Sequence, residues 1–218
     1  MIRVTTTDGW AWMGSGVLFD LDGVLVDSRL AIERAWRAWA AERGASWPLV
    51  ARLLPGRRAA DTIGAALPTL MAAAVAVEVD NVIDRQVVDT EALRAVDGMI
   101  DFVGGLGDAR WGTVTSCPHR LAEARLRATG YPWPVPALVA DEDVEVGKPH
   151  PEPYLVGARR LEVAPEQCLV VEDSPPGVAS AKAAGMTVLA LRTTHDAREL
   201  ADADAIVADG DSVRVSRS

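Results

Sequence analysis

Several features that mark other classes of protein are scarce or missing in this sequence. Its 218 residues include only two cysteines, Cys117 and Cys168, which show no CxxC or Cys/His spacing. A disulfide framework or a zinc site is therefore disfavoured, and we expect reduced thiols in a cytoplasmic protein. No apolar run approaches the roughly 18 residues that a membrane helix requires, so no membrane span is expected.

Positive charge is also scarce. Lysine and arginine number 22 against 31 aspartates and glutamates, which gives a net charge of −9, and no basic stripe with interleaved aromatics occurs. We therefore expect no nucleic-acid partner. An acidic chain that binds an anion must place a cation at its site, because like charges repel there.

The first 13 residues lack the basic start and the apolar stretch of a secretory signal. We interpret residues 1–13 as a flexible extension, because Met13 could itself be the start before the first strand. The chain has 49% hydrophobic and 24% charged residues, which is the composition of a folded globular protein.

Short apolar runs alternate with amphipathic segments along most of the chain. Strands that are apolar throughout and alternate with helices predict a parallel sheet covered on both faces. The predicted fold class is therefore α/β, with a doubly wound core. The expected strands are 17–19, 112–115, 137–140, 169–171, 188–191 and 205–207, and the expected helices are 118–129, 151–161 and 175–184.

One long stretch breaks this alternation. Between residues 28 and 93 no strand pattern occurs, whereas Ile32, Trp36 and Trp39 recur at helical spacing after Ser28, a candidate N-cap. We predict a helical module inserted after the first strand. The predicted organisation is an α/β core of residues 14–27 and 95–218, with the helical module at 28–94.

Two aspartates follow the first predicted strand. Asp20 and Asp22 are two residues apart, so on an extended segment their side chains point the same way. Ligands bind at the carboxyl ends of strands in doubly wound sheets. Two carboxylates that close together require a shared cation or proton. The alternative is that both residues only cap the strand and begin the turn at Gly23.

Three further polar clusters follow later strands. Ser116 and Cys117 precede a helix start, where a hydroxyl and free amides can hold a phosphate oxygen. Lys148 stands in a Gly-Lys-Pro tripeptide, which positions it, although a free surface lysine is the alternative. Glu172 and Asp173 end the strand at 169–171. With Asp20 and Asp22 these two acids would make an oxygen-rich pocket suited to Mg²⁺.

The ordered motifs DxDG, a Thr/Ser strand end, GKP and EDSxxG resemble the haloacid-dehalogenase superfamily, and the inserted module resembles its α-helical cap. The strings GKPHPEPYL and VEDSPPGVASAKAAGM resemble the small-molecule phosphatases of that superfamily. So does the GR pair at Gly56-Arg57, which is followed by Asp61-Thr62. Those enzymes act on glycerol phosphate, 2-deoxyglucose phosphate and other sugar or polyol phosphates.

This resemblance implies a Mg²⁺-dependent phosphatase with an aspartyl-phosphate intermediate. Asp20 would attack phosphorus, Asp22 would protonate the leaving alkoxide and later activate water, and Lys148 would bridge nucleophile and phosphate. The remaining implied roles are metal binding by Asp20, the backbone carbonyl of Asp22 and Asp173, with Glu172 as a further ligand or nearby acceptor, and phosphate or substrate binding by Ser116, the amide of Cys117, and Arg57.

The nearest alternative is a β-phosphoglucomutase-like phosphotransferase. Such relatives have a histidine twelve residues after the nucleophile, where this chain has Ile32, and a cap arginine three residues after the cap glycine, where it has Ala59. Arg57 and Arg58 nevertheless lie close. A dehalogenase would not use Asp22, and a phosphonate hydrolase would need a cap lysine, which residues 28–93 lack. A non-catalytic binding protein on the same fold is the third alternative. The sequence does not set the oligomeric state.

Overall fold

The computed structural model describes residues 1–54 and 56–217, so Pro55 and Ser218 lie outside the described residues. A central sheet contains β3 (Gly16–Phe19), β6 (Arg110–Val114), β7 (Leu138–Val139), β8 (Cys168–Glu172), β9 (Thr187–Leu191) and β10 (Ala205–Val207). All pair in parallel, in the order β10-β9-β8-β3-β6-β7. These are the six strands expected from the apolar runs, and the predicted α/β fold class is confirmed.

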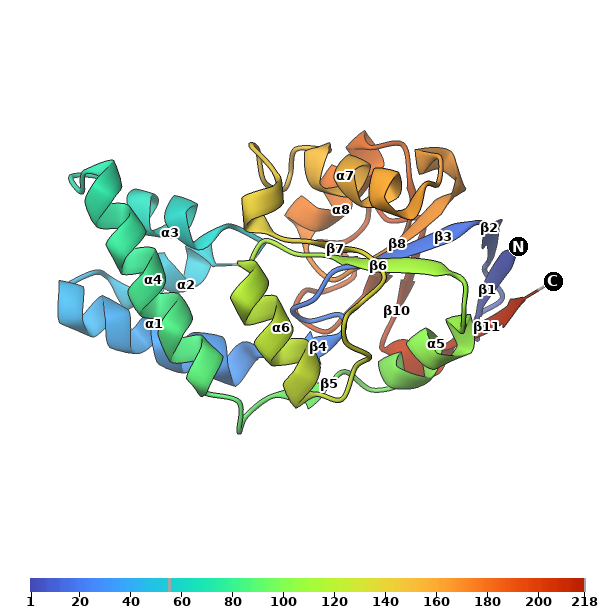
Figure 1. Cartoon of the computed structure of the whole chain (residues 1–218), viewed down its shortest axis with the longest axis horizontal. Coiled ribbons are helices and arrows are strands. Elements are labelled where there is room, and N and C mark those ends of the chain that lie inside the picture. The colour runs from blue at the N-terminus through green and yellow to red at the C-terminus, as the bar shows by residue number, and fades with distance from the viewer. Residues whose placement is uncertain (55, 218) are drawn as a thin grey trace.

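Helices cover both faces of this sheet (Figure 1). Those on one face are α5 (Met99–Leu106) and α6 (His119–Ala128), and those on the other are α7 (Glu152–Leu161) and α8 (Pro175–Ala183). Within β3, Val17 and Phe19 pack toward the first pair, whereas Leu18 packs toward the second. Because successive side chains point to opposite faces, burial of both faces requires an apolar residue at every position.

The central strand β3 determines where a site can form. It lies between β8 and β6, and all three run in the same direction, so their carboxyl ends share one edge of the sheet. Residues directly after these strands are therefore brought together, although they come from three distant parts of the chain. This edge is where ligands bind in doubly wound folds.

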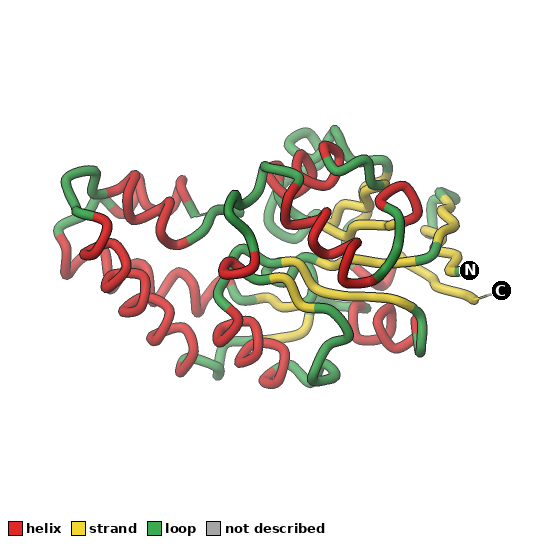
Figure 2. The backbone as a smooth tube through the Cα atoms, turned by 45° about the horizontal axis from the view of Figure 1, so that its top comes forward, coloured by secondary structure: helices red, strands yellow, loops and turns green. Residues whose placement is uncertain are grey.

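A purely helical part, without strands in Figure 2, lies beyond that edge. It comprises α1 (Arg29–Arg43), α2 (Trp47–Leu53), α3 (Ala59–Ala66) and α4 (Ala72–Val88). Trp36, Trp39 and Ile63 contribute to a hydrophobic cluster of its own. The chain leaves the core through β4 (Val26–Asp27) and returns through β5 (Arg94–Ala95), which pair antiparallel. Among the described residues, no helix combines the length and apolarity needed to cross a bilayer.

The interpretation of residues 1–13 as a flexible extension is wrong. They form β1 (Ile2–Thr6) and most of β2 (Ala11–Gly14), which join β11 (Val213–Arg217) in an antiparallel sheet of order β11-β1-β2. Ile2, Val4 and Trp12 are buried, so these strands extend the main hydrophobic core. Their partner comes from the opposite end of the chain, and no local pattern indicates such a pairing.

Candidate active site

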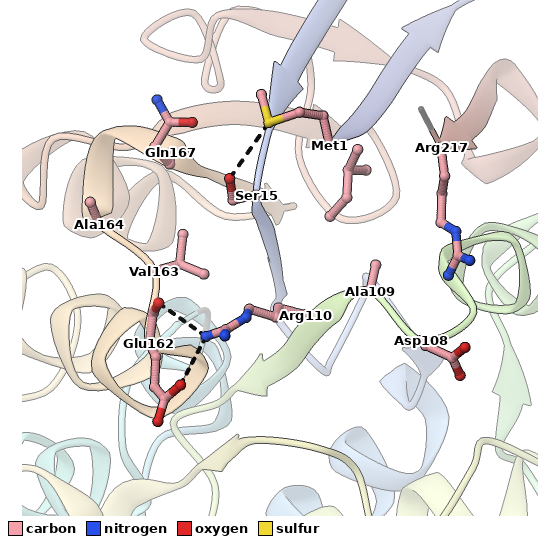
Figure 3. Close-up of a pocket in the computed structure, with 11 residues that line it drawn as sticks. Met1, Ser15, Asp108, Ala109, Arg110, Glu162, Val163, Ala164, Gln167 and Arg217 are labelled. Atoms are coloured by element: carbon pink, nitrogen blue, oxygen red, sulfur yellow. Dashed lines mark hydrogen bonds and ion pairs between the residues drawn. The ribbon is translucent and has the colours of Figure 1, made fainter.

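Two hollows lie at opposite ends of the central sheet. The larger, of about 670 Å³, lies near the chain termini and the amino ends of the strands (Figure 3). Arg110 there already donates to the carboxylate and the carbonyl of Glu162. The smaller, of about 380 Å³, lies at the carboxyl ends. The second hollow is the candidate site because it gathers the predicted residues. Those lining it include Asp20, Asp22, Arg57, Ser116, Cys117 and Asp173.

Lys148 joins the three central strands at this edge. Its ammonium Nζ lies 2.6 Å from Asp20 Oδ1, 2.7 Å from Glu172 Oε1 and 3.1 Å from the carbonyl of Val114. The side chain is buried, and burial alone would lower the pKa of Lys148. The charges of Asp20 and Glu172 outweigh burial and hold this pKa well above its ordinary value. Lys148 is therefore a fixed cation, and the free surface lysine is excluded.

Glu172 is fully buried, and both of its oxygens accept hydrogen bonds. Oε1 accepts from Lys148 and from the Tyr154 hydroxyl at 2.8 Å, and Oε2 accepts from the amides of Asp173 and Ser174. Burial acts to raise the pKa of Glu172, but Lys148 and these donors bring it below the ordinary value. A side chain at Gly177 would come within 1.7 Å of the carboxylate, so this position requires glycine. Glu172 thus acts mainly as an acceptor that holds Lys148.

Carboxylate oxygens of Asp20, Glu172 and Asp173 all lie within 4.8 Å of one another. Burial raises the pKa of Asp20 to about 7, with Glu172 and Asp22 adding to the rise and Lys148 opposing it. Burial, together with the negative charges of Glu172 and Asp20, raises the pKa of Asp173 well above its ordinary value. Three buried carboxylates face one ammonium, so the cluster has an unbalanced negative charge. A hard divalent cation with oxygen ligands fits this donor set.

The turn after β3 packs directly against Asp173. Gly23 has φ +87°, and a Cβ there would lie 2.0 Å from Asp173 Oδ2. Only glycine allows the DxDG turn to approach β8 this closely. The Thr194 hydroxyl donates to the Asp173 carboxylate, and His195 Nδ1 lies 3.0 Å from its carbonyl oxygen. The loop after β9 therefore completes the site.

Asp22 lines the hollow, but its carboxylate is held apart from the three-acid cluster. Its Oδ1 accepts from the Ser28 hydroxyl at 2.6 Å, and its Oδ2 accepts from Arg125 Nη1 at 2.5 Å. The Ser28 hydroxyl makes no cap hydrogen bond at the start of α1, so the candidate N-cap binds Asp22 instead. Asp20 and Asp22 thus have different partners, which allows them different chemical roles.

The predicted phosphate loop lies between β6 and α6. The Ser116 hydroxyl donates to the carbonyl of Gly56 at 3.3 Å, which connects this loop to the helical part. The amide of Cys117 donates to Thr115 Oγ1 at 3.2 Å rather than into the hollow. Burial raises the pKa of the Cys117 thiol to about 12, so the thiol is neutral. Phosphate binding by the Cys117 amide stays a prediction.

The two adjacent cap arginines have different environments. Arg57 lines the hollow. Arg58 pairs with Asp61 at 3.1 Å and with Asp141 at 3.4 Å, so it connects the helical part to the core. Of these two arginines, Arg57 is therefore the one that can contact a ligand in the hollow.

Sequence reasoning missed several residues of the site. Tyr154 stands within the string GKPHPEPYL, and Thr194 and His195 follow the last motif, but nothing local marks these three residues as neighbours of the acids. Arg125 had a usable signal, because it occupies the buried stripe of α6 with Leu121 and other apolar residues. A charged residue on an apolar helical face needs a buried partner.

The raised pKa of Asp20 predicts an unusual pH dependence of stability. Between about pH 4 and 7 the folded protein retains a proton on Asp20 that the unfolded chain has released, so the free energy of unfolding falls as pH rises. The stability of Asp20→Asn relative to wild type should therefore rise between about pH 4 and 7. At pH 8 the Tm of the variant should be higher by roughly 5 °C. Thermal melts of both proteins without metal, from pH 4 to 8, measure this difference.

Mg²⁺ supplies the control, because a bound cation would remove the same repulsion. It should raise the Tm of wild type more at pH 8 than at pH 5, and should leave Asp20→Asn nearly unchanged. An equal Mg²⁺ effect in both proteins, or at both pH values, would contradict this account.

The chain is similar to known phosphatases. The chain is 36% identical over 204 residues to hexitol phosphatase A of Escherichia coli K12, covering 93% of this chain and 94% of that protein. It is 34% identical to validoxylamine A 7'-phosphate phosphatase of Streptomyces hygroscopicus subsp. limoneus, covering 90% and 94%.

Solved structures share the fold of this chain. CbbY from Rhodobacter sphaeroides, in complex with phosphate, matches with a TM-score of 0.80 and 25% identity, covering 91% of this chain and 95% of that one. A β-phosphoglucomutase from Clostridium difficile also has a TM-score of 0.80, and at 19% identity that likeness shows the fold alone.

Residues 15–185 match the haloacid dehalogenase-like hydrolases. The chain belongs to this family of hydrolases, as its ordered motifs predicted.

Proposed function

We propose that the chain hydrolyses the phosphate monoester of a small polyol or sugar, with Asp20 as nucleophile. The observation that carries this proposal is the contact of Asp20 with Lys148 beside the buried carboxylate of Asp173, at the end of β3. The predicted enzyme class, a phosphoric monoester hydrolase, agrees with the relatives, which are named phosphatases.

The side chains of the site divide the proton-transfer and charge-balancing steps of this reaction among them. An Asp20 oxygen attacks phosphorus as the bond to the leaving oxygen breaks, and Asp22 gives that oxygen a proton. Asp22 then takes a proton from the water that releases phosphate from Asp20. Lys148, held by Glu172, offsets the charge on the phosphoryl oxygens, and the Ser116 hydroxyl is a further donor.

Mg²⁺ belongs to this proposal because the acids would otherwise repel a phosphate. The carboxylates of Asp20 and Asp173 and the backbone carbonyl of Asp22 would hold the ion. Glu172 would support the site mainly through Lys148, since its oxygens are already engaged. When bound, the ion supplies positive charge beside the phosphate.

The residues that the helical part contributes to the hollow favour a neutral leaving group. They include Trp36 and Trp47, and aromatic surfaces suit the C–H faces of a polyol. Arg29 is paired with Asp27, which offsets its positive charge. Arg57 is left as a donor to hydroxyl groups. We therefore also propose α1 to α4 as a cap over the substrate.

A mutase would need to hold a second phosphate. Arg58 lies near the expected position but is engaged by Asp61 and Asp141, and Ile32 lines the hollow where a histidine would stand. Hydrolysis is therefore the better supported reaction. Cytoplasmic location and reduced thiols remain part of the proposal, and Cys117 and Cys168 are both unpaired and buried.

A phosphate-release screen tests the substrate class. Hexitol, hexose and glycerol monophosphates should be hydrolysed with Mg²⁺ and not with EDTA. Phosphoglycolate and glucose 1,6-bisphosphate should be poorer by roughly tenfold or more in kcat/KM, since charge on the leaving group would meet only one arginine. A preference for phosphoglycolate or glucose 1,6-bisphosphate would refute the proposed substrate class. Phosphate release at the same rate with EDTA as with Mg²⁺ would refute the metal requirement.

A further inference from the structure

One buried cation near the site has no part in the roles above. Arg125, on α6, is 1% exposed, and its Nη1 donates to Asp22 Oδ2 at 2.5 Å. Its Nη2 donates to Gln86 Oε1 at 2.7 Å. Gln86 belongs to α4 and is itself buried. A continuous path therefore runs from the inserted helices through Arg125 to Asp22.

Stability alone does not explain an arginine at this position. Its Nε is buried and has no hydrogen-bond partner within residues 1–54 and 56–217, and an unsatisfied buried donor destabilises the fold. A buried ion pair is often no more stabilising than apolar residues of the same volume. Leu121, Ala122 and Leu126 show that the same helical face otherwise packs with apolar side chains.

The contacts of Asp22 show what Arg125 does. Asp22 contributes no carboxylate oxygen to the three-acid cluster, because its two oxygens are bonded to Ser28 and Arg125. The guanidinium is planar and forms two directed hydrogen bonds at once, which a lysine could not do with the same geometry. Arg125 thus determines where the Asp22 carboxyl group lies within the hollow.

We propose that Arg125, braced by Gln86, is a positioning residue that sets Asp22 for proton transfer to the leaving oxygen. It follows that Asp22 is correctly placed only when α4 packs on α6. This inference rests on the proposed function, since it assumes that Asp22 is the proton donor.

Leaving-group dependence provides a readout that a merely structural role would not change. An alkoxide needs a proton to leave, whereas p-nitrophenolate leaves without one. The ratio kcat/KM reports the first step, in which the leaving group departs, and not the later attack of water. Loss of Asp22 positioning should therefore slow a hexitol phosphate far more than p-nitrophenyl phosphate.

The experiment compares Arg125→Met and Gln86→Met with wild type on both esters. Arg125→Met should lower kcat/KM for the hexitol phosphate about 100-fold and for p-nitrophenyl phosphate less than about threefold. Gln86→Met should act in the same direction by about fivefold, the effect of one lost hydrogen bond. Circular dichroism checks folding, and Gln86→Met decides the question if Arg125→Met does not fold.

Arg120→Met is the matched control. Arg120 also lies on α6 and pairs with Asp80 and Asp84 of α4, but it does not contact Asp22. Arg120→Met should leave the ratio of the kcat/KM values for the two esters unchanged. Equal losses on both esters in the folded Arg125 or Gln86 variants would overturn the positioning role while the proposed function stood. Failure of wild type on both esters would instead overturn the proposed function.

Discussion

Replacing Asp20 by asparagine is expected to reduce turnover roughly 10⁴- to 10⁶-fold, the size of loss seen when an enzyme nucleophile is removed. The amide keeps the shape of the side chain but cannot attack phosphorus. It also removes one of three buried carboxylates that repel each other, so the variant should remain folded. Phosphate release from a hexitol phosphate under saturating Mg²⁺ measures the loss.

Asp101→Asn provides the matched control, because Asp101 is exposed on α5 and is not among the residues that line the hollow. Its activity should equal that of wild type. Acid-quenched wild type should carry a phosphoryl group on the peptide that contains Asp20, and Asp20→Asn should not. Turnover above about one tenth of wild type in Asp20→Asn would remove Asp20 as the nucleophile.

Replacing Lys148 by methionine should impair both catalysis and stability. Loss of one preorganised cation at the phosphoryl group should lower kcat by about 10²- to 10³-fold. Removal of one partner from a buried ion pair also leaves Asp20 and Glu172 without their cation, at a cost of about 3–5 kcal/mol. Steady-state kinetics and urea unfolding at pH 8 measure these effects. The loss of stability should be smaller near pH 5, because protonation of the buried carboxyl groups can then remove their unbalanced negative charge.

Lys182 is the other lysine in the chain and gives a direct comparison. Its ammonium pairs with Asp204 at 2.8 Å, and both side chains are partly exposed. Lys182→Met should therefore change the free energy of unfolding by no more than about 1 kcal/mol. If Lys148→Met cost no more than Lys182→Met, Lys148 would not be the cation that balances the buried acids.

The core of the fold could be predicted because its signals are local. A strand buried on both faces must be apolar throughout, as β3 and β8 are, and the groups that follow such strands reach a shared edge. Asp20, Asp173 and Lys148 were therefore recognisable from their positions after strands or within a constrained loop. The helical part between residues 28 and 93 was recognisable from its lack of strand patterns.

The sequence by itself thus determined a parallel core, a helical insertion and the polar groups at the strand ends, because each depends on neighbouring residues. Only the tertiary structure decided that Arg125 meets Asp22, across 103 positions of the chain, and that β1 pairs with β11. It also decided that Glu172 holds Lys148 rather than facing the hollow. A hydrogen bond between distant residues depends on where the chain returns, and packing of the whole fold sets that return.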